Sequence, residues 1–283
     1  ILVGDEVSGT VNAKIDNVGW DVAELRKASA YPKLQFGTWV GGDRDGHPLV
    51  TAEVTSDTLR RLRKHALRIH SKAVREAADI LTLSPPSAQV PEALSRRVVE
   101  LTKEQGNQGR EIAAIHSREP WRCLCYLMRE KLIDSNRAPY LLAEDYDADL
   151  TLMEQTLHEV GASTTSLNVI HPLHRLVQVF GFHLASLDIR QNSTVTTEVL
   201  SEIWGDAVSF GSSEWAARLR VEIAQNSDDL VPPKNLSDQS SELLNLLSTI
   251  CAARQGDDPD AIGAFILSMT RSTDDLIAIY VLA

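Results

Sequence analysis

The sequence contains few cysteines and no apolar run long enough to cross a membrane. Its 283 residues include only Cys123, Cys125 and Cys251, which are too few for a disulfide framework, so we expect a reducing compartment. A membrane-spanning helix needs about 20 consecutive apolar residues, and no run approaches that length. No signal peptide is visible either. These absences predict a cytoplasmic protein without a membrane partner.

Positive charge is also scarce. The chain has 28 Lys and Arg residues against 39 Asp and Glu residues, giving a formal net charge of −11. An acidic protein of this kind is repelled by phosphate backbones and anionic lipids, which excludes nucleic acid as a general partner. The hydrophobic fraction of 43% is ordinary for a globular protein. A chain of this length can form one large domain or two.

Several common chemical motifs are missing. The sequence has no glycine-rich phosphate loop, no serine-nucleophile elbow and no dinucleotide-binding fingerprint. Cys123 and Cys125 lie in a predicted helix without a second cysteine pair, so they are predicted to be core residues. His171 and His174 have a spacing seen in metal sites, but no further ligand follows at a fitting distance. We therefore predict no metal ligands in this chain.

Most of the sequence has the periodicity of amphipathic helices. Apolar residues recur at steps of three and four from Ser56, the expected N-cap, to Ile80. Another helix is predicted over Arg110–Ser135. Ala261–Thr270 is short and apolar, and it predicts a buried strand. Strands separated by several helices are typical of a parallel sheet, whose ligands gather at the carboxyl ends of the strands.

The first candidate site follows an apolar, β-prone stretch within Phe36–Pro48. Glycines end this stretch, and the charged trio Asp43, Arg44 and Asp45 comes next. Such a trio can cross-brace a loop or hold an anionic ligand. Trp39 is either a packing residue or the apolar wall of a small pocket.

The second candidate site lies in Phe182–Ser193. Side chains alternate across a strand, so Leu187 and Ile189 share one face while Asp188 and Arg190 share the other. An edge strand gives the same pattern, which leaves a structural role open. However, an arginine at the carboxyl end of a strand is well suited to phosphate or carboxylate.

Three segments resemble signatures of phosphoenolpyruvate carboxylases. The run FGTWVGGDRDGHP at Phe36–Pro48 is the closest match, LDIRQ at Leu187–Gln191 is the second, and ILSMT at Ile266–Thr270 is a weaker third. Two positions depart from the family pattern. His47 stands where the family usually has asparagine, and Asn192 stands where it usually has glutamate.

The resemblance implies a mainly helical protein with a few parallel strands, forming part of an eight-stranded TIM-type (β/α) barrel. Residues 1–283 would be one segment of a larger barrel domain, with a helical insertion at roughly 56–180. Members of the family are carboxy-lyases and form homotetramers. It converts phosphoenolpyruvate and bicarbonate to oxaloacetate and phosphate with Mg²⁺ or Mn²⁺. The resemblance places the metal ligands outside this chain.

The resemblance also implies roles for individual residues. By position, Arg190 is the catalytic residue that grips the substrate phosphate, and Trp39 is a wall of the pocket that holds carbon dioxide. The two side chains would then project into a common cavity from neighbouring parallel strands. Asp43, Arg44 and Asp45 belong to the signature loop, which braces the strand end or contacts substrate.

Two functional hypotheses follow. In the first, the chain is a segment of a phosphoenolpyruvate carboxylase and is inactive alone, which an assay for oxaloacetate would test. The chain begins without methionine and stops inside an apolar helical pattern, and both features favour this hypothesis. In the second, the chain is a non-catalytic helical binding or scaffold protein derived from the same fold.

Overall fold

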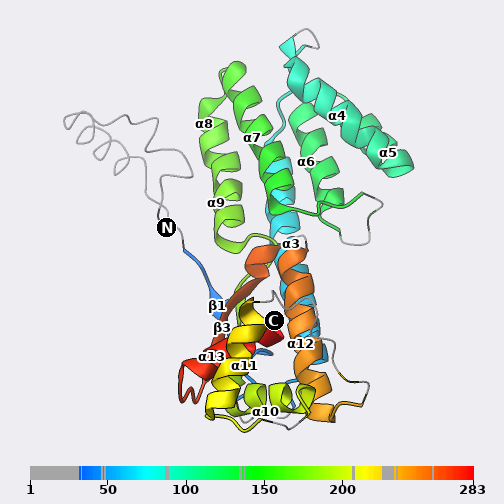
Figure 1. Cartoon of the computed structure of the whole chain (residues 1–283). Helices are drawn as coiled ribbons and strands as arrows, with labels where there is room; N and C mark the ends of the chain where they lie inside the picture. Colours follow the sequence, from blue (N-terminus) through cyan, green and yellow to red (C-terminus); the bar gives the residue numbers. More distant parts are fainter. Residues whose placement is uncertain are drawn as a thin grey trace, which may run out of the picture. The chain divides into compact units, whose positions relative to one another are not determined.

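The structure is a computed structural model that is mainly helical and contains one small parallel sheet (Figure 1). It describes residues 32, 34–45, 47, 49–86, 89–133, 136, 138–205, 208–224, 233, 235–256 and 258–283. None of the helices in these ranges is long and apolar enough to cross a membrane.

The helices and strands follow one another in the order β1 (Gly37–Thr38), α3 (Ala52–Ile80), α4 (Glu92–Glu104), α5 (Gly106–Ile115), α6 (Pro120–Lys131), α7 (Ala143–Glu159), α8 (Ser163–Thr165), the π-helix η3 (Ser166–Ile170), α9 (His171–Phe180), β2 (Ser186–Asn192), α10 (Ser193–Ile203), α11 (Ser213–Ala224), α12 (Asp238–Gln255), the 3₁₀-helix η4 (Pro259–Ala261), β3 (Ile262–Ser268) and α13 (Thr273–Leu282).

The sheet has the strand order β1-β2-β3, and both pairings are parallel. Gly37 pairs with Ser186 on one side of β2, and Ile266 pairs with Arg190 on the other. Helices α3 to α9 connect β1 to β2, and helices α10 to α12 connect β2 to β3. The prediction of parallel strands joined by helical crossovers is confirmed for these strands. It includes the strand predicted within Ala261–Thr270. The prediction that this strand is buried is wrong, because Ile262 is the one buried residue of β3 and Ala264 is exposed.

The first long helix begins earlier than its apolar pattern predicted. We expected Ser56 to be the N-cap, but α3 starts at Ala52. The Thr51 hydroxyl accepts a hydrogen bond from the backbone N–H of Val54 at 3.3 Å, so Thr51 supplies the cap. Ala52 is buried in the core, and its burial extends the apolar face of the helix by one turn.

The single helix predicted over Arg110–Ser135 is wrong, because the structure has two helices there. Helix α5 ends at Ile115, and α6 begins at Pro120. Proline has no backbone N–H, so it is tolerated in the first turn of a helix but not in its interior. The apolar periodicity continues across this boundary and hides it.

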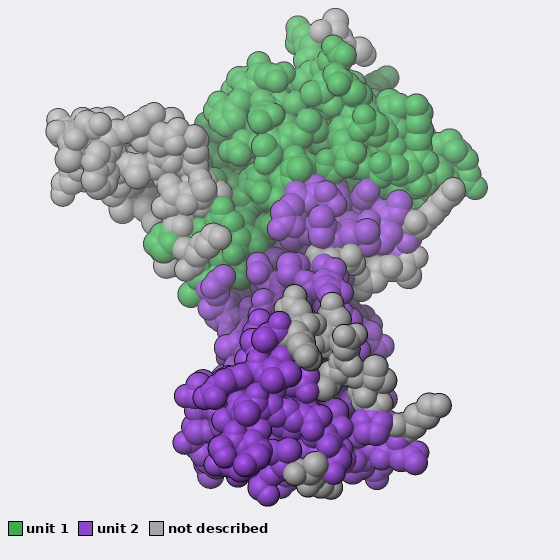
Figure 2. Space-filling view, viewed as in Figure 1, with its two compact units in different colours: residues 1–34, 73–128, 147–179 green, residues 35–72, 129–146, 180–283 purple. Residues whose placement is uncertain are grey.

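The chain divides into two compact units (Figure 2). Unit 1, green in Figure 2, comprises residues 1–34, 73–128 and 147–179. Its buried residues include Trp121, whose indole donates to the Thr156 hydroxyl at 3.0 Å. Arg97 forms two hydrogen bonds with Asp149, at 2.6 and 3.0 Å, and so joins α4 to α7. Unit 1 is therefore a helical bundle with its own apolar core.

Unit 2, purple in Figure 2, comprises residues 35–72, 129–146 and 180–283 and contains the sheet. Leu187 and Ile189 of β2 are fully buried, and they join one core cluster with residues of α10, α11, α12 and α13. Trp204 and Trp215 meet edge to face in this cluster, with ring centroids 4.8 Å apart. Helices therefore cover one face of β2, while Asp188 and Arg190 belong to the other face.

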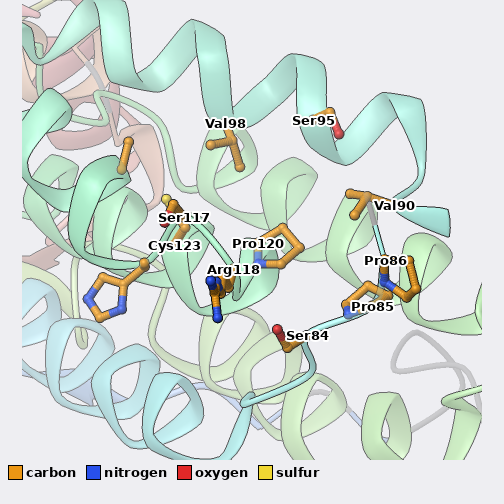
Figure 3. A pocket seen from close by; sticks show the side chains of 12 residues that line it. Ser84, Pro85, Pro86, Val90, Ser95, Val98, Ser117, Arg118, Pro120 and Cys123 are labelled. Atoms are coloured by element: carbon orange, nitrogen blue, oxygen red, sulfur yellow. The ribbon is translucent and has the colours of Figure 1, made fainter. Parts of the chain in front are cut away.

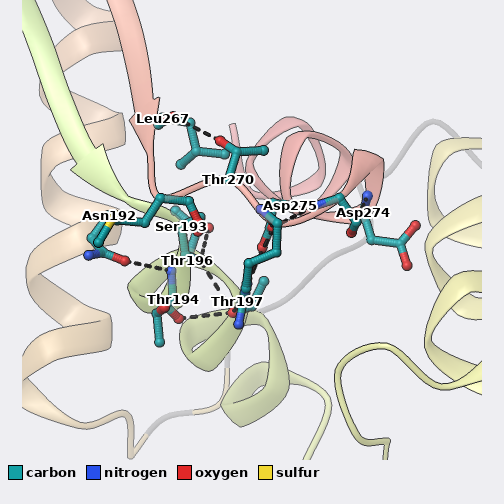
Figure 4. A network of polar contacts seen from close by, with 12 residues as sticks. Asn192, Ser193, Thr194, Thr196, Thr197, Leu267, Thr270, Asp274 and Asp275 are labelled. Carbon is teal, nitrogen blue, oxygen red and sulfur yellow. Dashed lines mark hydrogen bonds and ion pairs between the residues drawn. The ribbon is translucent and has the colours of Figure 1, made fainter.

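A buried carboxylate joins the end of β3 to helices α10 and α13 (Figure 4). Asp275 is fully buried and accepts from the Arg271 guanidinium at 2.6 Å and from the backbone N–H of Arg271 at 2.7 Å. Asp275 and Ser272 form a capping box at the start of α13. Arg271 also donates to the Thr197 hydroxyl at 3.0 Å. Burial alone raises the pKa of Asp275, but these hydrogen bonds lower the pKa below its usual value.

Replacing this carboxylate should destabilise unit 2 and change its response to acid. Asp275→Asn should lower the free energy of unfolding at pH 7 by about 2 kcal/mol, because bonds to a buried charged group are lost. Because the native pKa of Asp275 is lowered, its ionised carboxylate contributes fully to the free energy of unfolding above the unfolded-state pKa, about 4. This contribution is lost as the pH falls through the native pKa. The variant should lack this acid-dependent loss. Urea unfolding followed by tryptophan fluorescence, at pH 7 and at steps below pH 5, measures both effects.

Asp274→Asn provides the matched control, since it removes the same charge from the same helical turn. It should cost less than about 1 kcal/mol, as expected for a carboxylate that only favours the helix dipole. Equal losses in the two variants would contradict the role given to Asp275.

Candidate functional site

The chain leaves the sheet after β1 and then returns to it. Gly42 and Asp43 both donate backbone hydrogen bonds to the Trp39 carbonyl, which forms a tight turn. Asp43 then pairs with Arg190 in a parallel bridge. The backbone N–H of Arg190 donates to the Gly42 carbonyl at 2.8 Å, and the N–H of Arg44 donates to the Arg190 carbonyl at 2.8 Å. This return places the signature loop directly beside the end of β2.

Two glycines make the turn sterically feasible. Gly41 has a φ of +85°, a left-handed conformation that favours glycine. A Cβ atom on Gly42 would overlap the backbone oxygen of Asp188. The glycine pair of the sequence motif therefore lets the loop approach β2 closely.

Arg190 is the centre of the site. Its Nη2 lies 2.5 Å from Asp45 Oδ2, and its Nη1 lies 3.5 Å from Asp43 Oδ2. The guanidinium carbon lies 5.7 Å from the centroid of the Trp39 ring, which is a cation–π distance. The Arg190 side chain remains 32% exposed. The structure thus brings together four of the five predicted site residues, Trp39, Asp43, Asp45 and Arg190.

Hydrogen bonds hold the acidic side of the site in place. The Asp43 carboxylate accepts from the backbone N–H of Asp45 at 3.3 Å. The Asn192 amide donates to Asp45 Oδ1 at 3.2 Å. The Asn192 oxygen accepts from the backbone N–H of Thr194 at 2.9 Å and caps α10. Asn192 therefore links the start of α10 to the carboxylate nearest Arg190, and a glutamate could not donate this bond.

Arg44 points to a different partner. Its guanidinium donates to Glu242 of α12 at 3.2 Å, and its side chain is only 11% exposed. Glu242 also accepts from the backbone N–H of Ala52 at 2.5 Å, at the start of α3. Burial lowers the pKa of Arg44, and the Glu242 carboxylate partly offsets this effect. These contacts favour a bracing role for Arg44, which holds the loop against α3 and α12.

The sequence comparisons point to one family. The profile of phosphoenolpyruvate carboxylase matches residues 11–283. The chain belongs to the phosphoenolpyruvate carboxylase family. It is 33% identical to a phosphoenolpyruvate carboxylase of Methylorubrum extorquens, over 89% of this chain and 29% of the relative. Similar proteins of the same name occur in Roseiflexus castenholzii, with 30% identity over 89% of this chain and 29% of the relative, and in Nocardia farcinica, with 30% identity over 96% and 31%. The chain thus spans about 29% of the length of the first two relatives.

The carboxylate of Asp188 was not among the predicted site residues, yet it contacts the site. It accepts from the Trp39 indole N–H at 3.1 Å and from the backbone N–H of Ala264 on β3 at 2.8 Å. The alternation of side chains along the strand places Asp188 on the same face as Arg190. This alternation could have identified Asp188 as a site residue from the sequence. Its partner on β3 could not be read from the sequence, because it depends on the register of that strand.

The carboxylase family resemblance implies a divalent metal, so we tested whether these residues fit one. Among the described ranges, no three His, Cys, Asp or Glu side chains gather where they could hold a metal ion. Asp43 and Asp45 direct their carboxylates to Arg190 instead. The described residues therefore do not fit a divalent metal site, and we derive no chemical step from one.

Unit 1 contains a separate pocket of about 690 Å³ (Figure 3). It is lined by residues of α4, α5 and α6, of the segment after α3 and of the turn between α5 and α6, among them Val98, Arg118 and Cys123. Cys123 and Cys125 are buried, as predicted for core cysteines. Burial raises the pKa of Cys123 to about 11, so its thiol stays protonated at neutral pH and supplies no thiolate nucleophile. None of the predicted site residues lines this pocket.

The close approach of the loop to β2 can be tested at Gly42. Gly42→Ala should lower the free energy of unfolding by about 2 kcal/mol, because the added methyl group overlaps the backbone of Asp188 and must displace the loop. Gly37→Ala is the control on β1, where a Cβ atom would find its nearest neighbour, the Ser186 oxygen, at 3.8 Å. It should change stability by less than about 0.5 kcal/mol. Urea unfolding measures both, and a Gly42→Ala variant as stable as the parent would show that the loop does not approach β2 as described.

Proposed function

We propose that this chain is a segment of a phosphoenolpyruvate carboxylase and that Arg190 binds the phosphate of phosphoenolpyruvate. The observation that carries the proposal is the position of the Arg190 guanidinium. It lies at the carboxyl ends of two parallel strands, under the Trp39 ring, within the two segments that carry the family signatures. An arginine offers five N–H donors in a planar fork, which suits phosphate oxygens.

The chemistry of the proposed reaction explains why an arginine and an indole are needed together. Bicarbonate attacks phosphorus, which gives carboxyphosphate and the enolate of pyruvate. The enolate then captures the carbon dioxide that carboxyphosphate releases, and phosphate and oxaloacetate result. Arg190 would stabilise the charge on the transferring phosphoryl group. Trp39 would provide an apolar wall that retains neutral carbon dioxide and excludes water from the enolate.

The loop residues complete the proposed site. Asp43 and Asp45 would fix the orientation of Arg190, and direct contact of Asp43, Arg44 or Asp45 with substrate stays a prediction. Two carboxylates, those of Asp43 and Asp45, pair with the Arg190 guanidinium, and they oppose the binding of an anion. We therefore expect Arg190 alone to bind phosphate weakly. The other cationic groups of the site, and the residues that bind Mg²⁺ or Mn²⁺, would lie outside this chain.

The sheet supports the further proposal of a TIM-type barrel in the parent protein. Helices cover one face of β2, and the other face carries Asp188 and Arg190. Within the described part of the chain, β1 and β3 each pair with β2 alone, so each has an edge open to another strand. In a closed barrel, the polar face would line the interior and the site would lie at its carboxyl-end mouth. Residues 1–283 would be one segment of that domain, with a helical insertion at roughly 56–180.

We propose the remaining properties for the parent protein rather than for this segment alone. The parent would use phosphoenolpyruvate and bicarbonate, work in the cytoplasm and form a homotetramer. The 283-residue segment would bind substrate without turning it over.

Calorimetric titration of the chain with phosphoenolpyruvate tests the role of Arg190. Arg190→Gln should weaken binding by about tenfold or more, because a charge-assisted bond to phosphate is lost. Arg68→Gln is the control, since Arg68 is an exposed arginine of the same unit and should leave affinity unchanged. Binding that does not depend on Arg190 would contradict the proposal and favour a scaffold protein that has kept the fold without its substrate site.

A further inference from the structure

We propose that Asp188 is a positioning residue that fixes the Trp39 indole over Arg190 by tying it to β3. The functional consequence rests on the proposed function, but the positioning itself rests only on geometry. Asp188 lies on the central strand, and its two carboxylate oxygens reach the two neighbouring strands in opposite directions. Oδ2 accepts from the Trp39 indole after β1, and Oδ1 accepts from the backbone N–H of Ala264 on β3.

Both partners of Asp188 are donors, so only a group that accepts on both sides satisfies them. An ionised carboxylate accepts through each oxygen and donates nothing. An asparagine at this position would accept on one side and present its NH₂ group to an N–H on the other. The two contacts therefore require a carboxylate and not merely a polar side chain of this size.

The third strand is shaped to receive this carboxylate. The pairing of β2 with β3 shifts between Leu187 and Ile189, which pair with Ile262 and Phe265 respectively. Strand β3 thus has one extra residue opposite Asp188, as in a β-bulge. The bulge places the Ala264 N–H within reach of Asp188.

A glycine in the bulge leaves room for the acid. A Cβ atom on Gly263 would overlap Asp188 Oδ1. On the other side, a Cβ atom on Gly37 would lie 3.9 Å from Asp188 Oδ2. The carboxylate therefore lies between glycines on both neighbouring strands, and only β3 closes on it tightly.

Trp39 depends on this contact for its orientation. The residue is 48% exposed, lies in the turn after β1 and is not part of the buried core cluster. The described polar and ring contacts of its side chain are the hydrogen bond to Asp188 and the cation–π contact with Arg190. The Trp39 ring beside the proposed phosphate site is thus linked to β2 and β3 through the single carboxylate of Asp188.

Two-dimensional ¹H–¹⁵N spectra of the indole N–H groups test the positioning directly. The chain has five tryptophans, and the signal that disappears in Trp39→Phe identifies Trp39. In Asp188→Asn and Asp188→Ala, this signal alone should move upfield, and its exchange with solvent should accelerate about tenfold, as expected for loss of one bond to a charged acceptor. Asp260→Asn, an exposed acid before β3, is the control and should leave the signal in place.

Each outcome of these spectra decides the proposal. An unchanged Trp39 signal in either Asp188 variant would overturn it. A general loss of dispersion across all five signals would also overturn it, because Asp188 would then support the fold and not the indole specifically.

Phosphoenolpyruvate titration separates this inference from the proposed function. Asp188→Asn should weaken binding several-fold, and the same substitution should have no further effect in the Trp39→Phe background, since the coupling runs through the indole. An equal loss in both backgrounds would overturn the role of Asp188. By contrast, if Arg190→Gln does not weaken phosphoenolpyruvate binding, the proposed function is contradicted, while the spectral result for Asp188 still stands.

Discussion

The contact between the Arg190 guanidinium and the Asp43–Asp45 loop joins two strands whose sequences lie far apart. The side-chain bonds to Asp43 and Asp45 reinforce a backbone bridge between Asp43 and Arg190. This junction holds the loop after β1 beside the end of β2, where Trp39 lies over Arg190. Glycine at position 42 is the steric condition for the junction, because any side chain there would meet β2. The proposed site is therefore a consequence of how closely two backbones approach.

The rest of unit 2 keeps this junction in register. Leu187 and Ile189 anchor one face of β2 in the core, so Asp188 and Arg190 must face the other way. Helices are attached to the same strand ends by polar contacts. Asn192 caps α10 while holding Asp45, and Arg44 ties the loop to α12 through Glu242. The apolar core determines that Asp188 and Arg190 lie on the opposite face of β2. The polar contacts then hold the loop close to that strand.

The sequence predicted the strands better than it predicted the limits of the helices. Alternation of Leu187 and Ile189 with Asp188 and Arg190 is a local property, and it correctly assigned the two faces of β2. The break at Pro120 was missed because apolar periodicity continues through it. The bond from Ala264 to Asp188 could not be predicted, since it depends on a shift of register between strands that are 76 residues apart. Proximity of Trp39 to Arg190 was expected from the family resemblance together with parallel pairing, and the guanidinium carbon lies 5.7 Å from the Trp39 ring centroid.

The central claim is that Arg190 and Trp39 form one site for a phosphorylated substrate. A crystal structure of the chain grown with phosphoenolpyruvate tests it most directly. We expect phosphate oxygens within hydrogen-bond distance of the Arg190 guanidinium, with the Trp39 ring alongside the bound molecule. A ligand bound elsewhere, or an Arg190 and a Trp39 that lie apart in separate clusters, would contradict the account.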